Sequence, residues 1–235
     1  MEWVLESRGE EAGPGFSLPV ENYWPERYSP DGTKLLVTIG HFEGGSLGIY
    51  ELARGELVRI TGEEESQVCY LLCNGEEVAW PADSAGFFSA NGQNDFTYKT
   101  GGLWHVDAAS GAVTTLIPLG PAGGRINFPD EPHIGPDGLL YFFFVNYPEL
   151  AGTPIRPPFK LVRSAPDGIT GREVLRSDTF EWMNEALWAP DASFVFVAMA
   201  PDPDVYDGKQ AKMVYLDGRP GVVLAEFAEE MKWGQ

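Results

Sequence analysis

The chain has 235 residues, of which 35 are aspartate or glutamate and 16 are lysine or arginine, so its formal net charge is −19. Apolar residues make up 43% of the sequence, which is enough for a sizeable core and excludes a disordered polyanion. Nucleic acid and anionic membrane surfaces require clustered lysine and arginine, so the acidity argues against both as partners. No apolar run reaches the length of a transmembrane helix, which argues against membrane insertion.

Four turn motifs recur along the chain at an even spacing. Their aspartates are Asp31, Asp83, Asp137 and Asp191, at intervals of 52, 54 and 54 residues. The motifs read Ser29-Pro30-Asp31-Gly32, Pro81-Ala82-Asp83-Ser84, Gly135-Pro136-Asp137-Gly138 and Ala189-Pro190-Asp191-Ala192. A large apolar residue lies three positions before each aspartate, at Tyr28, Trp80, Ile134 and Trp188. Such self-similarity at a fixed period indicates a repeat architecture.

Each repeat continues in the same order after its turn. An apolar run is followed by a loop, a short alternating strand, a glycine-containing turn and a further strand. Glycine turns between runs of period two are typical of hairpins, so each repeat predicts a four-stranded antiparallel meander. Such meanders are the blades of a β-propeller. We therefore predict an all-β fold, a single β-propeller domain over 1–235, with blades at approximately 20–62, 63–118, 119–177 and 178–227.

The two ends of the chain match parts of a blade. Residues 1–19 resemble the third and fourth strands of a repeat, and residues 228–235 resemble an inner strand up to the point where the next Pro-Asp turn would begin. One interpretation is that these partial strands join as a fifth blade and close the ring. The other is that the chain is a segment of a longer propeller, with sheet edges that favour association.

The turn motif has a clear structural role. Proline fixes φ at one turn position, aspartate accepts a backbone N–H, and glycine supplies a positive φ. The large residue three positions earlier is expected to lie on the inner strand and to fill the space between blades.

The order of aromatic residue, Pro-Asp-Gly, apolar strand, alternating strand and glycine turn resembles the propeller repeat of the TolB-type, WD-like family. The resemblance covers about residues 20–226, although Ala82-Asp83-Ser84 departs from the turn and Ile134 replaces the aromatic residue. It implies binding more than catalysis, since members serve as protein-interaction platforms. Similar propellers also cover the active sites of prolyl-oligopeptidase-type peptidases.

A second pattern concerns glutamate. An acid occurs six residues before the repeat aspartate, or five in the first blade, and would lie near the start of each innermost strand. The positions are Glu26, Glu77, Glu131, Glu185 and Glu230. A ring of carboxylates at the mouth of a central channel would attract cations or a basic partner. The alternative is a solvated strand end that blunts a sheet edge.

Two further features are candidate binding sites. The aromatic residues Tyr23, Trp24 and Trp182 occupy connections leading into inner strands, where they could bind a partner or pack between blades. The carboxylates of Asp202, Asp204 and Asp207 are spaced closely enough for a weak calcium site, or form a solvated polar turn. Calcium is the one cofactor considered.

These patterns favour a non-catalytic binding or scaffolding propeller with a protein or peptide partner, which would be basic if it binds the acidic channel mouth. No catalytic residue is assigned. The alternatives are an accessory propeller of a larger prolyl-oligopeptidase-like hydrolase, or a propeller glycoside hydrolase that uses two of the channel acids. The resemblance implies an extracytoplasmic location. The first six residues, however, lack the basic start and apolar stretch of a signal peptide, so the compartment stays open.

Overall fold

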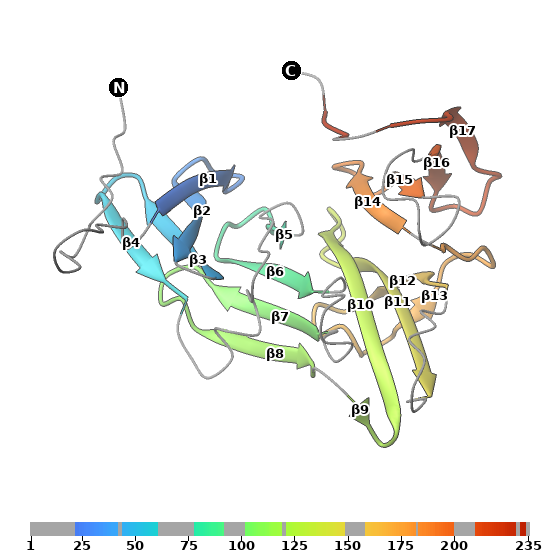
Figure 1. The fold of residues 1–235 in the computed structure, drawn as a ribbon, viewed down its shortest axis with the longest axis horizontal. Helices are drawn as coiled ribbons and strands as arrows, with labels where there is room; N and C mark the ends of the chain where they lie inside the picture. Colours follow the sequence, from blue (N-terminus) through green and yellow to red (C-terminus); the bar gives the residue numbers. More distant parts are fainter. Residues whose placement is uncertain are drawn as a thin grey trace, which may run out of the picture. The chain divides into compact units, whose positions relative to one another are not determined.

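The computed structural model shows an all-β architecture over the residues that it describes, with no helix among them (Figure 1). The described residues are 22–41, 44–60, 78–91, 102–118, 121–148, 158–181, 183–199, 210–228 and 231–233. Their strands form four sheets, and in each sheet the spatial order of the strands follows the chain. Within this part of the chain no helix is long and apolar enough to cross a membrane.

The first two sheets each contain four strands. The first consists of β1 (Asn22–Tyr28), β2 (Lys34–His41), β3 (Gly44–Glu51) and β4 (Glu56–Arg59). The second consists of β5 (Val78–Ala79), β6 (Gly86–Asn91), β7 (Gly102–Asp107) and β8 (Val113–Ile117).

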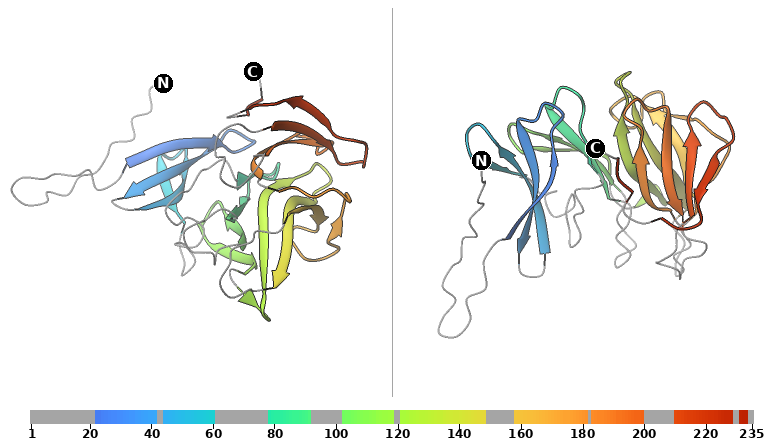
Figure 2. Two further views of the ribbon diagram at one scale, coloured as in Figure 1. Left: turned by 45° about the vertical axis from the view of Figure 1, so that its right-hand side comes forward. Right: turned by 90° about the horizontal axis from the view of Figure 1, so that it is seen from above.

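The third sheet has five strands and the fourth has four. The third consists of β9 (Pro121–Ala122), β10 (Arg125–Ile134), β11 (Leu140–Pro148), β12 (Lys160–Ser164) and β13 (Glu173–Val174). The fourth consists of β14 (Met183–Trp188), β15 (Phe194–Met199), β16 (Gln210–Tyr215) and β17 (Val222–Ala225), which lie side by side in Figure 2. These strands confirm the predicted four-stranded repeat.

The chain divides into two compact units. One comprises Met1–Ser89 with Trp104–Thr114, and the other comprises Ala90–Leu103 with Thr115–Gln235. The third and fourth sheets therefore lie within one unit. The organisation of all blades as a single domain stays a prediction.

The fifth strand of the third sheet was not predicted. Gly123 and Gly124 have φ of +63° and +74°, and they connect Ala122 directly to its strand partner Arg125. Two consecutive residues with positive φ form the tight hairpin whose twist matches that of its strands. This hairpin adds β9 beside the first residues of β10.

All four repeat turns confirm the predicted role of aspartate. In each, one carboxylate oxygen accepts the backbone N–H two residues later, at 3.0–3.1 Å. The donors are Thr33, Ala85, Leu139 and Ser193. The residue after the aspartate always has a positive φ, at +67° and +74° for Gly32 and Gly138 and +55° for both Ser84 and Ala192.

Ser84 explains why the second turn departs from Pro-Asp-Gly. Its side chain is fully buried, and its hydroxyl accepts the backbone N–H of Asp31 at 3.2 Å. The hydroxyl therefore joins the turn of the first sheet to that of the second. A glycine would fit the left-handed conformation better but would leave this N–H without its acceptor.

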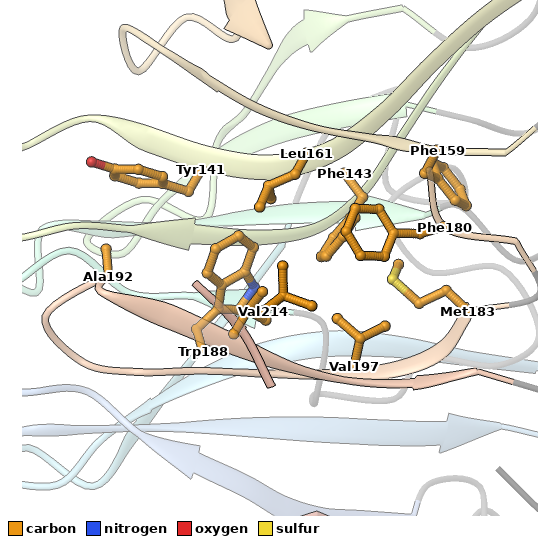
Figure 3. Close-up of a cluster of buried hydrophobic side chains, with 11 residues drawn as sticks. Tyr141, Phe143, Phe159, Leu161, Phe180, Met183, Trp188, Ala192, Val197 and Val214 are labelled. Carbon is orange, nitrogen blue, oxygen red and sulfur yellow. The ribbon is translucent and has the colours of Figure 1, made fainter. Parts of the chain in front are cut away.

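One of the large apolar residues that precede the turns, Trp188, fills the space between two sheets as predicted. Trp188 is 8% exposed and extends from β14 into a cluster contributed by the third and fourth sheets (Figure 3). Its ring lies 5.7 Å from that of Phe143 and 6.3 Å from that of Tyr141, both on β11. Val195, Val197 and Val214 complete the face of the fourth sheet that is buried here.

The same prediction was wrong for Tyr28, which is 57% exposed. Trp188 is buried because the third sheet precedes it and offers an aromatic surface. No sheet precedes β1 among the described residues, so the equivalent side chain of the first repeat has no such surface to pack against.

Replacing Ser84 tests the bond between the first two turns. Ser84→Ala keeps the left-handed backbone and removes the acceptor, so the free energy of unfolding should fall by about 1–2 kcal/mol. Ser84→Gly removes the same acceptor but relieves about 1 kcal/mol of backbone strain, and should be the more stable variant. Urea denaturation measures both. A Ser84→Ala protein as stable as the parent would contradict this role.

Acid should weaken the fold through the turn aspartates. The hydroxyl of Ser29, then the backbone N–H and hydroxyl of Thr33, hold the pKa of Asp31 far below its usual range. The hydroxyl and backbone N–H of Ser193 lower the pKa of Asp191 in the same way. Each carboxylate therefore stabilises the fold above the unfolded pKa of about 3.9, and this stabilisation is lost as the pH falls toward the folded pKa.

The double variant Asp31→Asn/Asp191→Asn should show a shallower loss of the urea midpoint between pH 5 and pH 3, a window of about two units around that unfolded pKa. Glu56→Gln/Glu181→Gln removes two exposed carboxylates and serves as a control for net charge. Equal slopes for the two double variants would rule out a special contribution of the turns.

Candidate functional site

The predicted channel acids coincide with irregularities in the inner strands. Glu26, Glu131 and Glu185 are described, whereas Glu77 and Glu230 lie outside the described residues. The strand register shifts between Pro25 and Arg27, between Asp130 and His133, and between Met183 and Glu185. Each described glutamate therefore lies in or beside a β-bulge, a feature that redirects side chains.

The predicted position of these acids near the start of the strand was wrong for two of them. β1 begins at Asn22 and β10 at Arg125, so Glu26 and Glu131 lie well inside their strands. In β10 the hairpin at Gly123 and Gly124 lengthens the strand at its beginning.

Glu131 is an internal hydrogen-bond acceptor. The residue is 7% exposed, and its backbone has a φ of +47°, in the left-handed region. Its Oε1 accepts the backbone N–H of Ala186 at 3.2 Å, and its carbonyl oxygen accepts Nε1–H of Trp188 at 3.0 Å. Both donors belong to β14, so Glu131 links the inner strand of the third sheet to that of the fourth.

Glu185 makes the corresponding contact one repeat later. Its Oε1 accepts the backbone N–H of Met231 at 2.6 Å. Met231 stands in the same place after Glu230 as Ala186 does after Glu185. The carboxylates of Glu131 and Glu185 are thus both engaged by backbone N–H groups of the following segment.

Glu26 differs from these two acids. It is exposed, and its Oε1 accepts the hydroxyl of Thr38 on the neighbouring strand at 2.6 Å. The next residue, Arg27, donates from Nη1 to the carbonyl oxygen of Val78 at 3.1 Å. Val78 is the residue of the second repeat that aligns with Ala186, so an arginine links the first two sheets at this position.

Two of the candidate aromatic residues lie on a strand and not in a connection, which corrects the prediction. Tyr23 and Trp24 belong to β1. Trp24 is 50% exposed, and its ring lies so close over Gly40 that any side chain at that position would collide with it. The third aromatic residue, Trp182, lies outside the described residues.

The predicted calcium loop also lies outside the described residues, because Asp202, Asp204 and Asp207 all fall in the range 200–209. Within the described part, no three histidine, cysteine or carboxylate side chains gather closely enough to hold a metal ion. The calcium site stays a prediction.

A cavity of about 310 Å³ lies between the third and fourth sheets. Its lining residues are Tyr141, Arg163, Leu175, Ala192, Ser193, Leu216, Asp217 and Arg219. The charged groups of its wall pair with carboxylates: Arg163 with Glu173, and Arg219 with Asp217 at 2.7 Å. Burial raises the pKa of Tyr141, whose hydroxyl donates to Asp137 at 2.8 Å.

This wall offers paired polar groups and no activated nucleophile. The hydroxyl of Ser193 donates to Asp191 at 2.6 Å, a contact that belongs to the repeat turn. Since aspartate here accepts turn hydrogen bonds, the arrangement stabilises the turn and does not resemble a nucleophile beside its general base.

An exposed apolar strip lies at the C-terminal end of the described chain, and sequence reasoning missed it. It consists of Val222, Val223, Leu224, Phe227 and Trp233, which are 44–55% exposed. Val222 pairs with Met213 and Val223 pairs with Lys212, so these two neighbours point to opposite faces of the sheet and both faces carry exposed apolar side chains at this edge. Exposed apolar side chains that gather at one edge are typical of interaction sites. The composition of the outermost strands could have revealed this strip. β17 reads Val-Val-Leu-Ala, whereas the outermost strands β4 and β13 contain charged residues and β8 contains threonines.

Comparison with known proteins adds information about the fold. No protein-family model and no curated protein matches the chain. Solved structures do match, and three of them are similar over 88% of this chain. They are TolB from Acinetobacter baumannii, with 14% identity and a TM-score of 0.54; an oligogalacturonate lyase in complex with manganese, with 17% and 0.55; and a nidogen–laminin complex, with 16% and 0.52.

The fold is that of a β-propeller. The four sheets are its blades, which confirms the resemblance found in the sequence. The chain spans only 43% of the TolB chain, 54% of the lyase chain and 65% of the matched chain in the nidogen–laminin complex. At these identities the similarity establishes the architecture of the propeller and not an activity.

Replacing Glu131 should reveal its structural role. Glu131→Ala leaves the half-buried N–H of Ala186 without this acceptor and should lower the free energy of unfolding by about 1–2 kcal/mol. Glu131→Gln keeps an acceptor oxygen and should lose less. Glu26→Ala, at the exposed position of the first repeat, should change stability by no more than about 0.5 kcal/mol. Urea denaturation gives all three values, and equal losses for the two alanine variants would contradict the assignment.

Proposed function

We propose that the chain is a non-catalytic protein-binding propeller, and that the exposed apolar strip is its binding surface. The main observation behind this proposal is the strip itself. It exposes five large apolar side chains near the C-terminal end of a chain whose formal net charge is −19. Burying one such side chain against a partner contributes about 1.5–3 kcal/mol, so a few of them suffice for specific binding.

Two further observations support a protein as the partner. Among the described strands, β17 forms one edge of its sheet and pairs with β16 alone, so the backbone groups on its other side face away from the sheet. An edge strand with apolar side chains can extend its sheet with a strand of a partner. One of the similar propellers, in the nidogen–laminin complex, is itself seen bound to another protein.

The acidic channel mouth is a less favourable binding surface than the sequence suggested. A cationic partner would have to displace the backbone N–H that Glu131 or Glu185 binds. The strip requires no such exchange. Binding of a basic partner to the remaining acids is still a proposal, but no contact in the described structure favours these acids over the strip as the binding surface.

Site-specific crosslinking tests the proposed surface. A photoreactive residue at Leu224 should yield one discrete adduct in the cells that naturally make the protein, because the strip contacts a defined partner. The same residue at Thr114, exposed on the outermost strand of the second sheet, is the matched control and should yield none. No adduct at Leu224, or the same set of adducts at both positions, would refute the proposal.

A further inference from the structure

One wall of the cavity between the third and fourth sheets is built from a row of paired strand residues. Tyr141, Arg163 and Glu173 are direct partners across β11, β12 and β13, so their side chains point to the same face of the third sheet. Tyr141 lies at the edge of the cluster that both sheets share, so this face is turned toward the fourth sheet (Figure 3). The side chain of Arg163 hydrogen-bonds both of its neighbours in the row.

The opposite wall consists of two turns of the fourth sheet. Ser193 follows the turn between β14 and β15, and Asp217 and Arg219 lie in the turn between β16 and β17. The backbone N–H of Leu216 donates to the carbonyl oxygen of Ser193 at 3.1 Å and joins the two turns. The guanidinium of Arg219 lies 4.1 Å over the ring of Tyr215, with its Nε 2.7 Å from Asp217, so it is held in a defined position.

A buried arginine fixes this second wall from the third sheet. Arg176 is 7% exposed, and its Nη1 donates to the carbonyl oxygens of Tyr215 and Arg219 at 2.6 Å and 2.7 Å. The backbone N–H of Arg219 lowers the pKa of Asp217, and the charges of Arg219 and Arg176 lower it further. The positive charge of Arg176 therefore reaches the cavity wall.

Both lining arginines retain donors for a ligand. A guanidinium carries five N–H donors in a fork and can engage carboxylates on different edges. Arg219 contacts Asp217 through Nε, and within the described part of the chain no hydrogen bond uses its Nη1 or Nη2. Arg163 binds a single oxygen of Glu173, through Nε and Nη2. The pairs orient the two guanidiniums without using all of their donors.

The rest of the lining sets the size and polarity of a ligand. Leu175, Ala192 and Leu216 provide its apolar part. The volume of about 310 Å³ is at the small end of ligand sites, which span about 300–1,000 Å³. Every lining residue is described and belongs to the unit that comprises Ala90–Leu103 with Thr115–Gln235. The cavity therefore depends neither on the ends of the chain nor on the placement of the other unit.

We propose that this cavity binds a small organic acid with a short aliphatic body. The carboxylate of the acid binds the guanidiniums of Arg163 and Arg219, and the aliphatic body lies against Leu175 and Leu216. Arginines that are already held by neighbouring groups lose little freedom on binding, which favours a charged ligand even in a chain with a net charge of −19. This site is separate from the exposed apolar strip, and its ligand does not require a protein partner.

A titration of the full chain with 4-methylpentanoate tests the proposal. Calorimetry should show saturable binding at one site with a Kd of about 1 mM or tighter. The uncharged 4-methylpentanamide has nearly the same shape and should bind at least about tenfold more weakly, because it cannot form charge-assisted hydrogen bonds with arginine. Methyl NMR should show shifts at Leu175 and Leu216 on addition of the acid and none at Leu57, on β4 of the first sheet.

Two arginine variants locate the site. Arg219→Gln removes a lining guanidinium and should weaken binding of the acid about tenfold or more. Arg54→Gln makes the same change of charge at an arginine that also pairs with a nearby acid, Glu51, and should alter binding by no more than about twofold. The side chains of Arg219 and Arg54 are 62% and 69% exposed, so both variants should fold.

Any of four outcomes would overturn the proposal. These are no saturable binding of 4-methylpentanoate, equal binding of its amide, equal effects of the two arginine variants, and methyl shifts confined to residues outside the cavity. Tighter binding of a tripeptide that ends in leucine than of the free acid would also contradict it, since the ligand would then be the end of a protein chain.

Discussion

The hydrogen bonds of Glu131 fix how the third and fourth sheets meet. Three features that are each unfavourable alone coincide at this residue: a bulge, a left-handed backbone and a buried carboxylate. Together they direct one carboxylate oxygen to the N–H of Ala186 and the carbonyl oxygen to the indole of Trp188. The polar contacts thereby set the register in which Trp188 enters the core formed with Tyr141 and Phe143 (Figure 3).

The sequence allowed the repeat to be predicted because its signals are local. The aspartate of each turn acts on an N–H only two residues away, so the motif at Asp31 or Asp191 is visible without the fold. The regular spacing of the glutamates was equally visible, but its meaning was not. The acceptor at Glu131 serves a donor 55 residues later, and only the packing of two sheets shows that they meet.

Two other features, the burial of the residue before the turn and the role of Ser84, could not be predicted from the local sequence. Tyr28 and Trp188 occupy the same place in their repeats, yet one is exposed and the other buried, because burial depends on the preceding sheet and not on the side chain. The sequence shows Ser84 only as a departure from Pro-Asp-Gly, whereas in the structure its hydroxyl accepts a backbone N–H of the first turn. The apolar strip was overlooked for a related reason: four apolar residues predict a strand, but not what covers it.

The contacts that assemble the repeat continue past the last strand of the fourth sheet. Glu131 accepts the backbone N–H of Ala186, and Glu185 accepts that of Met231, so each of these acids acts on the segment that follows its own sheet or strand by about one repeat. The indole ring of Trp233 then packs on Phe194 and Phe196 of β15. One acidic position that recurs with the period of the blades therefore positions successive segments, although each contact spans far more of the sequence than a turn motif does.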